Sequence, residues 1–594
     1  MDNPCYILGI SCYYHDSAAV LLKDGVLAAA AHEERFTRIK HDENFPKNAI
    51  EYCLREAGIS KDDLAYVVFY DKPLSKFERI LITAIDAWPM GYLQMLQSLT
   101  LWLSKKLWMR QQIAKDLRFN GDILFCEHHL SHAASAYYSS PFQDAAVVTV
   151  DGVGEWETTT LGSGKNQDLT LTHAIHFPHS LGLLYSAVTG YLGFKVNSAE
   201  YKVMGLAPYG NPEPYLGQML HLIDVKDDGS YVLNMKYFAY TYGFRMTNRH
   251  FHKLFGGPPR RPESPLTQRE KDIAAALQFV TEEIMLKIVR HAHRLHPSEN
   301  LCLAGGVALN CVANGRILRE GPYKHLFIQP ASGDAGGALG AAQYVWHGIL
   351  GNPKTKASEM THVYYGPAFT DPEIEAYLNG QAKNDAGGEV KWTKFETEEA
   401  LLDHVAQLID GENVIGWFQG RMEFGPRSLG SRSIIADARN VNNWKKVNVK
   451  IKFRESFRPF APTVLQEHAS EWFDLTEESP YMLLVAQVKK QGIPAVTHVD
   501  NSARIQTIRH DQNPRYHALI KRFHARTGCP VIINTSFNVR GEPIVCSPQD
   551  AFKCFLHTDM DYLVMGSYVL SKKDHTHLVT GEEREKYLAK FQLD

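Results

Sequence analysis

The chain has 594 residues, of which 44% are hydrophobic and 22% charged, and its formal net charge at pH 7 is −3. This composition is ordinary for a globular protein and excludes a disordered, collagenous or coiled-coil chain. Because the charge is nearly balanced, no overall basic field recruits nucleic acid. The 9 cysteines form no CxxC pair, which favours a reducing, cytoplasmic compartment over a secreted disulfide framework.

The N-terminal part predicts two copies of one strand pattern. Each copy is a strand–turn–strand–turn–strand unit, which indicates two related halves whose turns, at Asp16 and at residues 151–154, face each other across a cleft. Glycines in such turns let backbone N–H groups approach a phosphate closely. The predicted strands span 6–10, 18–22 and 26–31 in the first copy and 145–150, 157–161 and 169–175 in the second, with a turn at 162–166.

Between the two copies lies an uncharged, apolar stretch, residues 87–104. It has only the minimum length of a membrane span, and it contains Pro89 and polar side chains that would lie in hydrocarbon. The first residues also lack the basic start of a signal peptide. We therefore expect no membrane segment, and a buried helix, a lid over a substrate pocket or a subunit contact instead. A homodimer would use the apolar residues 80–109.

Two strand–glycine–helix units follow a long helix predicted over residues 272–296. In each unit a strand ends in a glycine turn, at 305–306 and at 333–337, and a helix begins behind it. This order places a helix N-terminus behind an anion. After a linker at 351–364, a second α/β unit contains the buried strand 531–534. We predict an α/β fold with two domains.

Two imidazoles and two carboxylates are candidates for a metal site. His128 and His132 lie four residues apart on a predicted helix, so both rings project from one face. Asp151 ends an apolar strand downstream, and Asp334 stands among glycines. A histidine pair at this spacing also arises by chance in a chain with 27 histidines. Together the four side chains suit Fe(II), Mn(II) or Zn(II) and leave positions for ligand oxygens.

His15 and Lys40 border the first predicted cleft. His15 is either a core histidine hydrogen-bonded to backbone or a general base, since imidazole titrates near neutral pH. Lys40 belongs to the charge run 34–42, which is either a solvated face or a contact to a nucleotide phosphate.

The second domain is rich in arginines that stand beside glycine or proline. Forked guanidinium groups held by rigid loops suit a small dianion or a triphosphate. Asn534 and Ser536, at the end of a buried strand, could complete that site. The arginines are Arg421, Arg427, Arg432, Arg439, Arg454, Arg458 and Arg504.

Several blocks of sequence are specific in combination. They are His15-Asp16-Ser17-Ala18-Ala19, Glu34-Arg35 with Lys40-His41-Asp42, His128 with His132, and residues 201–210, 305–310, 424–427, 457–460 and 534–538. Together they resemble the NodU/CmcH-type O-carbamoyltransferases, which decorate nodulation factors and antibiotics. The resemblance covers about residues 5–570, with Ser428 where the family pattern has alanine. Residues 74–120 and 213–265 match no block, and we expect them to shape acceptor specificity.

The resemblance implies both a fold and a reaction. The expected fold is a duplicated actin-like ATPase domain of the Kae/TsaD type over residues 1–352, followed by a YrdC/Sua-like domain over 353–594. The C-terminal site would convert carbamoyl phosphate and ATP, with Mg²⁺, into carbamoyl-adenylate, releasing phosphate and pyrophosphate. The N-terminal site would transfer the carbamoyl group to a hydroxyl of a small-molecule natural product, such as an antibiotic or a toxin, and release AMP.

The family's roles carry over to matching residues of this chain. His15 would deprotonate the acceptor hydroxyl, and the resemblance favours Fe(II) as the metal. Carbamoyl phosphate would bind to Arg427, Arg458, Arg504, Asn534 and Ser536. The metal would bind to His128, His132, Asp151 and Asp334, and the ATP or adenylate to Lys40, Gly306, Asn310, Gly333, Asp334 and Gly337.

Three other functions would use parts of the same pattern. A tRNA threonylcarbamoyl-type transferase shares both folds but needs a basic surface for tRNA, which a net charge of −3 does not favour. A sugar kinase on the actin-like core leaves the arginine-rich domain unexplained. A non-catalytic, ATP-regulated binding protein would turn over nucleotide slowly and without dependence on carbamoyl phosphate. We expect neither a nucleic-acid nor a membrane partner.

Overall fold

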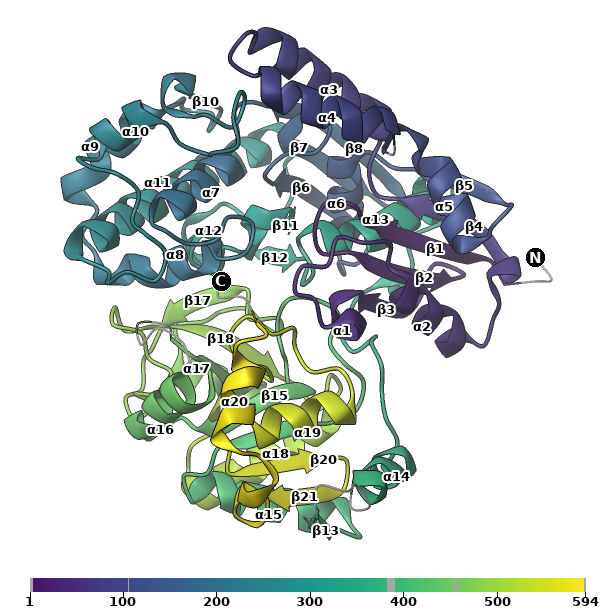
Figure 1. Cartoon of the computed structure of the whole chain (residues 1–594), viewed down its shortest axis with the longest axis vertical. Coiled ribbons are helices and arrows are strands. Elements are labelled where there is room, and N and C mark those ends of the chain that lie inside the picture. The colour runs from purple at the N-terminus through teal and green to yellow at the C-terminus, as the bar shows by residue number, and fades with distance from the viewer. Residues whose placement is uncertain (1–3, 105, 382–389, 453–456, 458, 592–594) are drawn as a thin grey trace. The chain divides into compact units, whose positions relative to one another are not determined.

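The computed structural model describes residues 4–104, 106–381, 390–452, 457 and 459–591. Its contacts divide the chain into two compact units (Figure 1). Unit 1 comprises Met1–Glu33 and His41–Met360, and unit 2 comprises Glu34–Lys40 and Thr361–Asp594. Both units combine helices and sheets, so the predicted α/β class is confirmed.

The segment Glu34–Lys40, which contains the short helix α1 (Glu34–Thr37), groups with the C-terminal unit. Arg38 explains this grouping. Its guanidinium donates to the backbone oxygens of Pro543 and Ile544 at 2.7 and 2.6 Å and forms an ion pair with Glu542 at 3.1 Å. This part of the charge run is therefore tied into the protein and does not form a solvated face.

Unit 1 contains two five-stranded sheets with the same topology. Each starts with three antiparallel strands, and two further strands continue in parallel on the other side of the first strand. The repeat predicted from the sequence is thus a repeat of the whole sheet. The first sheet has the order β3 (Val26–His32), β2 (Ala18–Lys23), β1 (Tyr6–Ser11), β4 (Leu64–Phe69), β5 (Asp122–Phe125). The second has the order β8 (Asp168–His176), β7 (Glu157–Lys165), β6 (Asp144–Val150), β11 (Asn300–Ala304), β12 (His325–Ile328).

The turn predicted at 162–166 is wrong for residues 162–165 and correct only for Asn166. Strand β7 continues through these residues and pairs with β8 as far as Lys165. The glycines that suggested a turn serve close packing instead. A Cβ at Gly162 would lie 2.1 Å from the backbone oxygen of Thr170, and one at Gly164 would lie 2.3 Å from the Tyr137 ring. The chain turns at Asn166, whose φ is 57°.

Helices α6 (His128–Tyr137) and α13 (Asp334–Tyr344) pack against each other between the two sheets of unit 1. Helix α13 lies on β1 and β2 of the first sheet, and α6 lies on β6 and β11 of the second. Their close approach requires glycine. A Cβ at Gly340 would lie 1.7 Å from the backbone oxygen of Ser131, and one at Gly9 would lie 1.9 Å from that of Ala338.

The long helix of unit 1 is α11 (Gln268–Leu295). It begins earlier than the predicted residue 272 because Thr267 and Glu270 form a capping box. The helix predicted after Gly306 is interrupted, since Asn310 caps α12 (Cys311–Glu320) by accepting from the N–H of Ala313. The other elements of unit 1 are α2 (Lys47–Ala57), α5 (Met109–Leu117), α7 (Leu181–Tyr191), α8 (Glu200–Leu206), α9 (Glu213–Leu222), β9 (Ile223–Val225), β10 (Tyr231–Leu233) and α10 (Arg249–Leu254).

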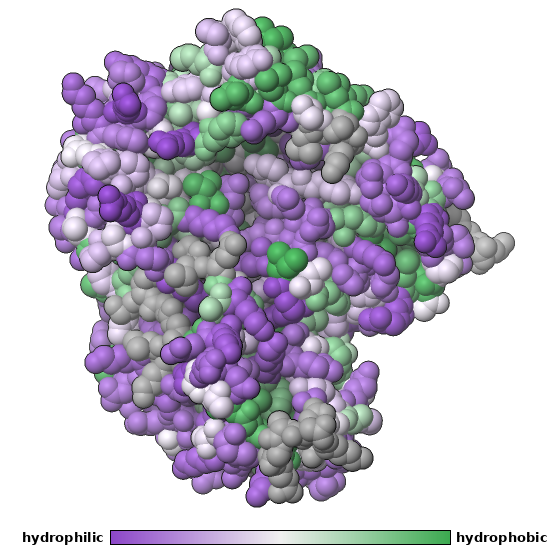
Figure 2. Space-filling view, in the orientation of Figure 1, coloured by the Kyte–Doolittle hydropathy of each residue, from purple (hydrophilic) through white to green (hydrophobic). Residues whose placement is uncertain are grey.

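The apolar stretch 87–104 forms the loop and second helix of a hairpin made by α3 (Pro73–Asp86) and α4 (Tyr92–Ser104). The expected buried helix is wrong for most of it, because Trp88, Met90 and Leu93 expose 59%, 71% and 66% of their surface. In Figure 2 apolar residues gather over this hairpin at the top of the view. Across the described ranges, no helix combines the length and apolar character needed to cross a bilayer.

Unit 2 is built on one mixed, nine-stranded sheet packed against helices. The predicted buried strand 531–534 is the start of β19 (Val531–Ser536), which lies inside the sheet between β15 and β16. In spatial order the other strands are β13 (Thr393–Lys394), β21 (Tyr568–Ser571), β20 (Tyr562–Met565), β14 (Ile415–Phe418), β15 (Arg432–Asp437), and, beyond β19, β16 (Ala461–Leu465), β18 (Ser502–Ile508), β17 (Leu484–Gln487). The helices are α14 (Asp371–Gln381), α15 (Glu398–Asp410), α16 (Val441–Lys446), α17 (Ala469–Trp472), α18 (Pro514–Thr527), α19 (Pro548–Leu556) and α20 (Gly581–Leu588).

The contact between α6 and α13 predicts the effect of a single methyl group. Gly340→Ala should lower the free energy of unfolding by about 1–3 kcal/mol, because the methyl overlaps the Ser131 backbone. Gly217→Ala on α9 is the matched control, since no atom lies within 4 Å of its added Cβ. Alanine there should stabilise the protein by up to about 1 kcal/mol. Chemical denaturation of both variants measures the difference, and equal stabilities would contradict the packing argument.

Candidate active site

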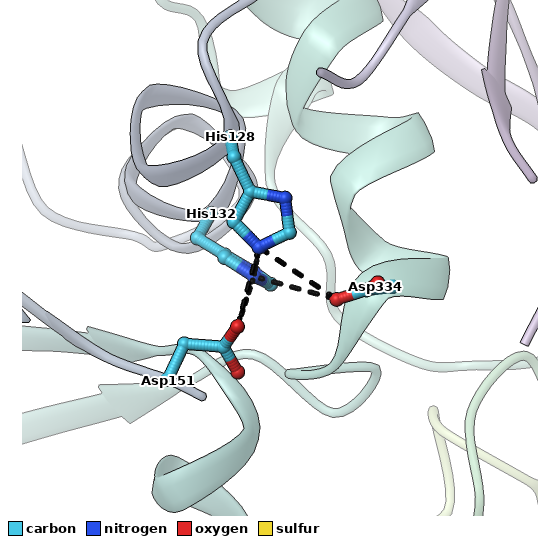
Figure 3. Close-up of side chains that lie close together, drawn as sticks. All are labelled: His128, His132, Asp151 and Asp334. Atoms are coloured by element: carbon cyan, nitrogen blue, oxygen red, sulfur yellow. Dashed lines mark hydrogen bonds and ion pairs between the residues drawn. The ribbon is translucent and has the colours of Figure 1, made fainter. Parts of the chain in front are cut away.

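Four buried side chains converge at one end of α6 and α13 (Figure 3). His128 and His132 come from successive turns of α6, Asp151 follows β6, and Asp334 is the first residue of α13. Their candidate ligand atoms all lie within 4.8 Å of one another. The structure therefore brings together the four residues that the sequence nominated as metal ligands.

The distances suit a shared cation. His128 Nε2 lies 3.1 Å from His132 Nε2 and 3.2 Å from Asp151 Oδ2. Asp334 Oδ1 lies 3.7 Å from His128 Nε2 and 3.9 Å from His132 Nε2. Donor atoms that each bind a metal at about 2.0–2.2 Å are separated by such distances. Nitrogen and carboxylate donors of this kind fit a divalent first-row metal, and all four ligands come from unit 1.

Two neighbouring groups orient the carboxylates of this cluster. The backbone N–H of Gly306 donates to Asp151 Oδ1 at 2.7 Å, and the Tyr70 hydroxyl donates to Asp334 Oδ2 at 3.1 Å. Sequence reasoning missed Tyr70, because a tyrosine directly after a buried strand carries no metal-site pattern. Partners of this kind fix the orientation of metal ligands.

The protonation of the two histidines differs in the absence of a metal. Burial lowers the pKa of both rings, but for His128 the hydrogen bond to Asp151 and the charge of Asp334 outweigh burial and raise the pKa to about 9. For His132, burial and the positive charge of His128 lower the pKa to about 4. At neutral pH His128 is therefore protonated and His132 is neutral in the metal-free protein. A cation would have to displace the proton of His128, so acid conditions should weaken metal binding.

Glu155 is a second residue that sequence reasoning did not find. Its carboxylate accepts from the backbone N–H of His128 at 3.0 Å and of Lys72 at 2.7 Å, so it holds the start of α6. Burial and the neighbouring charge of Asp71 raise the pKa of Glu155 to about 8. Asp71 itself forms a buried ion pair with Lys76, which holds the pKa of Asp71 low against the effect of burial.

His15 lies beside the cluster and is held by Asp16. His15 Nδ1 lies 3.0 Å from Asp16 Oδ2, and His15 Nε2 lies 3.8 Å from Asp334 Oδ2. Asp16 also accepts from His41 Nδ1 at 2.7 Å, and His41 Nε2 lies 2.9 Å from the Ser198 hydroxyl. Burial lowers the pKa of His15, but Asp334 and Asp16 together raise it well above its ordinary value. A cation on Asp334 would remove part of that effect.

The residues proposed for nucleotide binding in unit 1 have different surroundings. Asn310 exchanges two hydrogen bonds of 3.0 Å with Gln278 and caps α12, which are structural contacts. A Cβ at Gly337 would lie 2.7 Å from Tyr70, whereas Gly333, just before α13, has no atom within 4 Å of that position. Lys40 belongs to unit 2.

In unit 2, the pairing of the strands brings three of the predicted carbamoyl phosphate residues to one face of the sheet. Thr463 of β16 pairs with Gln506 of β18, and Ala461 pairs with Asn534 of β19. Since residues two apart share a face, Arg504, Asn534 and Ser536 lie on the same side. The Asn534 amide donates to Gln506 Oε1 at 2.8 Å, which connects the strands on this face. Arg427 lies in the loop before β15, and Arg458 lies outside the described residues.

Lys452 is a residue of unit 2 that sequence reasoning missed. It is buried, and its ammonium donates to the Ser536 hydroxyl at 3.2 Å and to Asn538 Oδ1 at 2.7 Å. These contacts hold the segment after β19 in place. No sequence motif marks Lys452, because it lies more than 80 residues from its partners.

Three of the seven arginines hold the unit together. Arg432 is fully buried and donates to the backbone oxygens of Gln419 and Pro367 at 2.7 and 3.0 Å. Arg421 donates to the backbone oxygen of Tyr365 at 2.8 Å, and Arg439 pairs with Asp437 at 2.6 Å. Their positions beside glycine and in apolar stretches therefore reflect packing, whereas Arg454 lies outside the described residues.

The chain matches two protein-family models. Residues 6–343 match the model described as the carbamoyltransferase N-terminus, and residues 406–572 match the carbamoyltransferase C-terminus. The first match contains the four-residue cluster and His15. The second contains Arg504, Asn534 and Ser536.

Curated relatives extend over much of the chain. The uncharacterized protein sll1178 of Synechocystis sp. is 53% identical over 99% of this chain and 100% of its own length. Nodulation protein NolNO of Sinorhizobium fredii is 38% identical over 94% of this chain and 79% of its own length. The 3'-hydroxymethylcephem-O-carbamoyltransferase of Streptomyces clavuligerus is 32% identical over 50% of this chain and 53% of its own length.

Solved structures overlap this chain only weakly. HypF of T. kodakarensis is 14% identical, with a TM-score of 0.30, over 59% of this chain and 48% of its own. Component A of the (R)-2-hydroxyglutaryl-CoA dehydratase of Acidaminococcus fermentans is 14% identical, with a TM-score of 0.34, over 58% of this chain and 99% of its own. Overlaps this low carry no argument about the fold or the function.

The four-residue cluster predicts a divalent metal site that can be removed by single substitutions. The wild-type protein, loaded without oxygen with Fe(II) and in parallel with Mn(II) or Zn(II), should retain metal, whereas His132→Ala should lose it. Tyr70→Phe should weaken binding by about 10-fold, because it removes a partner of a ligand. The exposed His250→Ala is the control. Elemental analysis after dialysis measures retention, and full retention by His132→Ala would contradict the site.

Proposed function

Because the chain belongs to the carbamoyltransferase family, we propose that it is an ATP-dependent O-carbamoyltransferase that modifies a hydroxyl of a small-molecule natural product. The observation that carries this proposal is the convergence of His128, His132, Asp151 and Asp334 with His15 beside them. This arrangement combines a site for a cation with an imidazole beside it, and a cation bound to Asp334 would lower the raised pKa of His15 so that its Nε2 can act as a base. Both functions can accelerate the transfer of an acyl group.

We propose that unit 2 makes carbamoyl-adenylate. Water first cleaves carbamoyl phosphate into carbamate and inorganic phosphate. A carbamate oxygen then forms a bond to the α-phosphorus of ATP as the bond to pyrophosphate breaks, and Mg²⁺ accompanies the ATP. Arg427, Arg458 and Arg504 neutralise the phosphates, and Asn534 and Ser536 hold the small donor through hydrogen bonds. The location of Arg504, Asn534 and Ser536 on one sheet face supports this assignment. The mixed anhydride activates the carbonyl because AMP is a good leaving group.

Unit 1 would then hold the adenylate and the acceptor. Gly333 and the start of α13 offer backbone N–H groups and a helix N-terminus, which favour a phosphate. Gly306, whose own N–H donates to Asp151, would let the adenylate approach the backbone closely because it has no side chain. Gly337 and Asn310 belong to the proposed adenylate set of unit 1, Asn310 through the segment that its hydrogen bonds to Gln278 hold in place. Lys40, which groups with unit 2, would contact a nucleotide phosphate. His128, His132, Asp151 and Asp334 would hold the metal, with Fe(II) preferred to Mn(II) or Zn(II), and when bound it would polarise the phosphate or carbonyl oxygen.

His15 would act on the acceptor hydroxyl. Because its Nδ1–H donates to Asp16, the lone pair of Nε2 can take the proton of the hydroxyl. The hydroxyl oxygen then forms a bond to the carbamoyl carbon as the bond from that carbon to AMP breaks. The products are the carbamate ester and AMP.

The proposal also includes the fold family and the cellular setting. The duplicated sheets of unit 1 support a duplicated actin-like ATPase domain of the Kae/TsaD type, and unit 2 would be a YrdC/Sua-like domain. Relatives named for nodulation and for a cephem carbamoyltransferase support a hydroxylated natural product, such as an antibiotic or a toxin, as the acceptor. The cysteines are all free thiols in the structure, which supports a cytoplasmic enzyme, because disulfides rarely form in that reducing compartment.

The adenylation step predicts pyrophosphate release without any acceptor. The metal-loaded protein should release pyrophosphate from ATP only when carbamoyl phosphate is present. Arg504→Gln should lower this rate by about 100-fold, because it removes a buried contact to an anion. Arg526→Gln, an exposed arginine on α18, is the matched control. Release that is independent of carbamoyl phosphate would contradict the proposed donor chemistry and favour an ATP-regulated binding protein.

The transfer step predicts a separation between the two half-reactions. His15→Ala should release pyrophosphate at the wild-type rate but transfer the carbamoyl group about 10²- to 10⁴-fold more slowly, because the general base is absent. Mass spectrometry of a panel of hydroxylated acceptors measures the transfer, with His250→Ala as the control. Transfer by His15→Ala at the full rate would overturn the role of His15.

A further inference from the structure

Arg79 is a buried cation without a counter-ion. It lies on α3 and exposes only 8% of its surface, with its guanidinium 4.9 Å from the Phe177 ring. Its buried Nε has no hydrogen-bond partner, and the guanidinium forms no ion pair with any described residue. An arginine side chain remains charged in proteins. A buried guanidinium in this state is costly unless an anion joins it.

The two carboxyl groups that act electrostatically on Arg79 already have other partners. Asp71 forms its ion pair with Lys76. Glu155 accepts hydrogen bonds from the backbone of His128 and Lys72. Both carboxyl groups are close enough to influence the charge on Arg79, yet neither bonds to it. The Arg79 guanidinium can therefore bind an anion that the described residues do not supply.

Two lysines lie near the segment Tyr13–His15, namely Lys106 and Lys76, of which Lys76 is paired with Asp71. Lys76, one turn before Arg79 on α3, lies 5.0 Å from the Tyr14 ring, and that ring lies 4.7 Å from the His15 ring. Lys106 donates to the backbone oxygen of Tyr13 at 3.0 Å. Burial lowers the pKa of Lys106, and the charge of Lys76 lowers it further. Tyr14 is 41% exposed, so solvent reaches the Tyr14 ring beside His15.

We propose that Arg79, together with Lys76 and Lys106, forms an oxyanion-binding subsite beside His15 that takes an acidic group carried by the acceptor. The ligand chemistry is a phosphate, sulfate or carboxylate, which a guanidinium fork can bind with two hydrogen bonds. Anchoring the acceptor here would hold its hydroxyl near Nε2 of His15. This inference rests on the proposed function for its acceptor, whereas the anion site itself does not.

The anion site can be located directly in crystals of the full chain soaked in selenate. We expect an anomalous peak within hydrogen-bond distance of the Arg79 guanidinium in the wild type and in Arg110→Gln, an exposed arginine on α5. The peak should be absent in Arg79→Gln and retained in Arg79→Lys. If Arg79→Gln does not fold, Lys106→Gln should weaken the peak. A wild-type crystal with no peak at Arg79, or with selenate only on surface lysines, overturns the site.

The source of the anion is decided by kinetics and binding. In matched pairs of sugars with and without an acidic group, such as glucose 6-phosphate and glucose, the acidic member should show a KM lower by about 10- to 100-fold in the wild type. Arg79→Gln should abolish that preference, whereas Arg110→Gln should keep it. Equal use of acidic and neutral sugars by the wild type would overturn the acceptor assignment.

Two further readouts separate this inference from the proposed function. Arg79→Gln should bind ATP and AMP as the wild type does and release pyrophosphate at the same rate. If it weakens AMP binding by the same factor as it raises the acceptor KM, the anion belongs to the donor and the acceptor assignment is wrong. If the wild type releases no pyrophosphate with carbamoyl phosphate, the proposed function fails, while the selenate peak still decides the anion site.

Discussion

The candidate active site of unit 1 depends on the contact between α6 and α13. Gly340 and Gly9 carry no side chain, so α13 can lie directly against the backbone of α6 on one side and β1 on the other. This close packing brings the N-terminal ends of the two helices together, and with them His128 and Asp334 to within 3.7 Å. Two buried imidazoles and two buried carboxylates are costly by themselves, and a shared cation would satisfy them all.

The repeated sheets explain why the site has contributions from both halves. In each sheet the chain leaves the first strand at the same place in the topology and turns back into the second strand. The turn of the first half carries His15 and Asp16, and the turn of the second half begins with Asp151. Asp334, on the helix between the sheets, lies near both. One arrangement of strands, used twice, thus brings His15 and the four-residue cluster to a common point.

The buried arginines and lysines of this protein differ in whether other residues of the chain satisfy them. In unit 2, Arg432 and Arg38 bind backbone oxygens of their own unit, which satisfies buried carbonyl groups and orders loops. In unit 1, Lys76 is paired with Asp71, whereas Arg79 on the next turn of the same helix has no counter-ion among the described residues. Residue type does not show which of these cations has a partner, because the partners come from distant parts of the chain or from other elements.

The sequence by itself determined the α/β class, the repeat of the strand pattern and the four residues that the structure brings together as a candidate metal site. Periodic apolar runs and glycine turns are local signals, and the spacing of His128 and His132 is a property of one helix. Only the tertiary structure decided that Gly162 and Gly164 pack inside a strand, that Glu34–Lys40 belongs to unit 2, and that Tyr70, Glu155 and Lys452 support the sites. Their partners are distant in sequence, so their roles depend on long-range packing that no local pattern records.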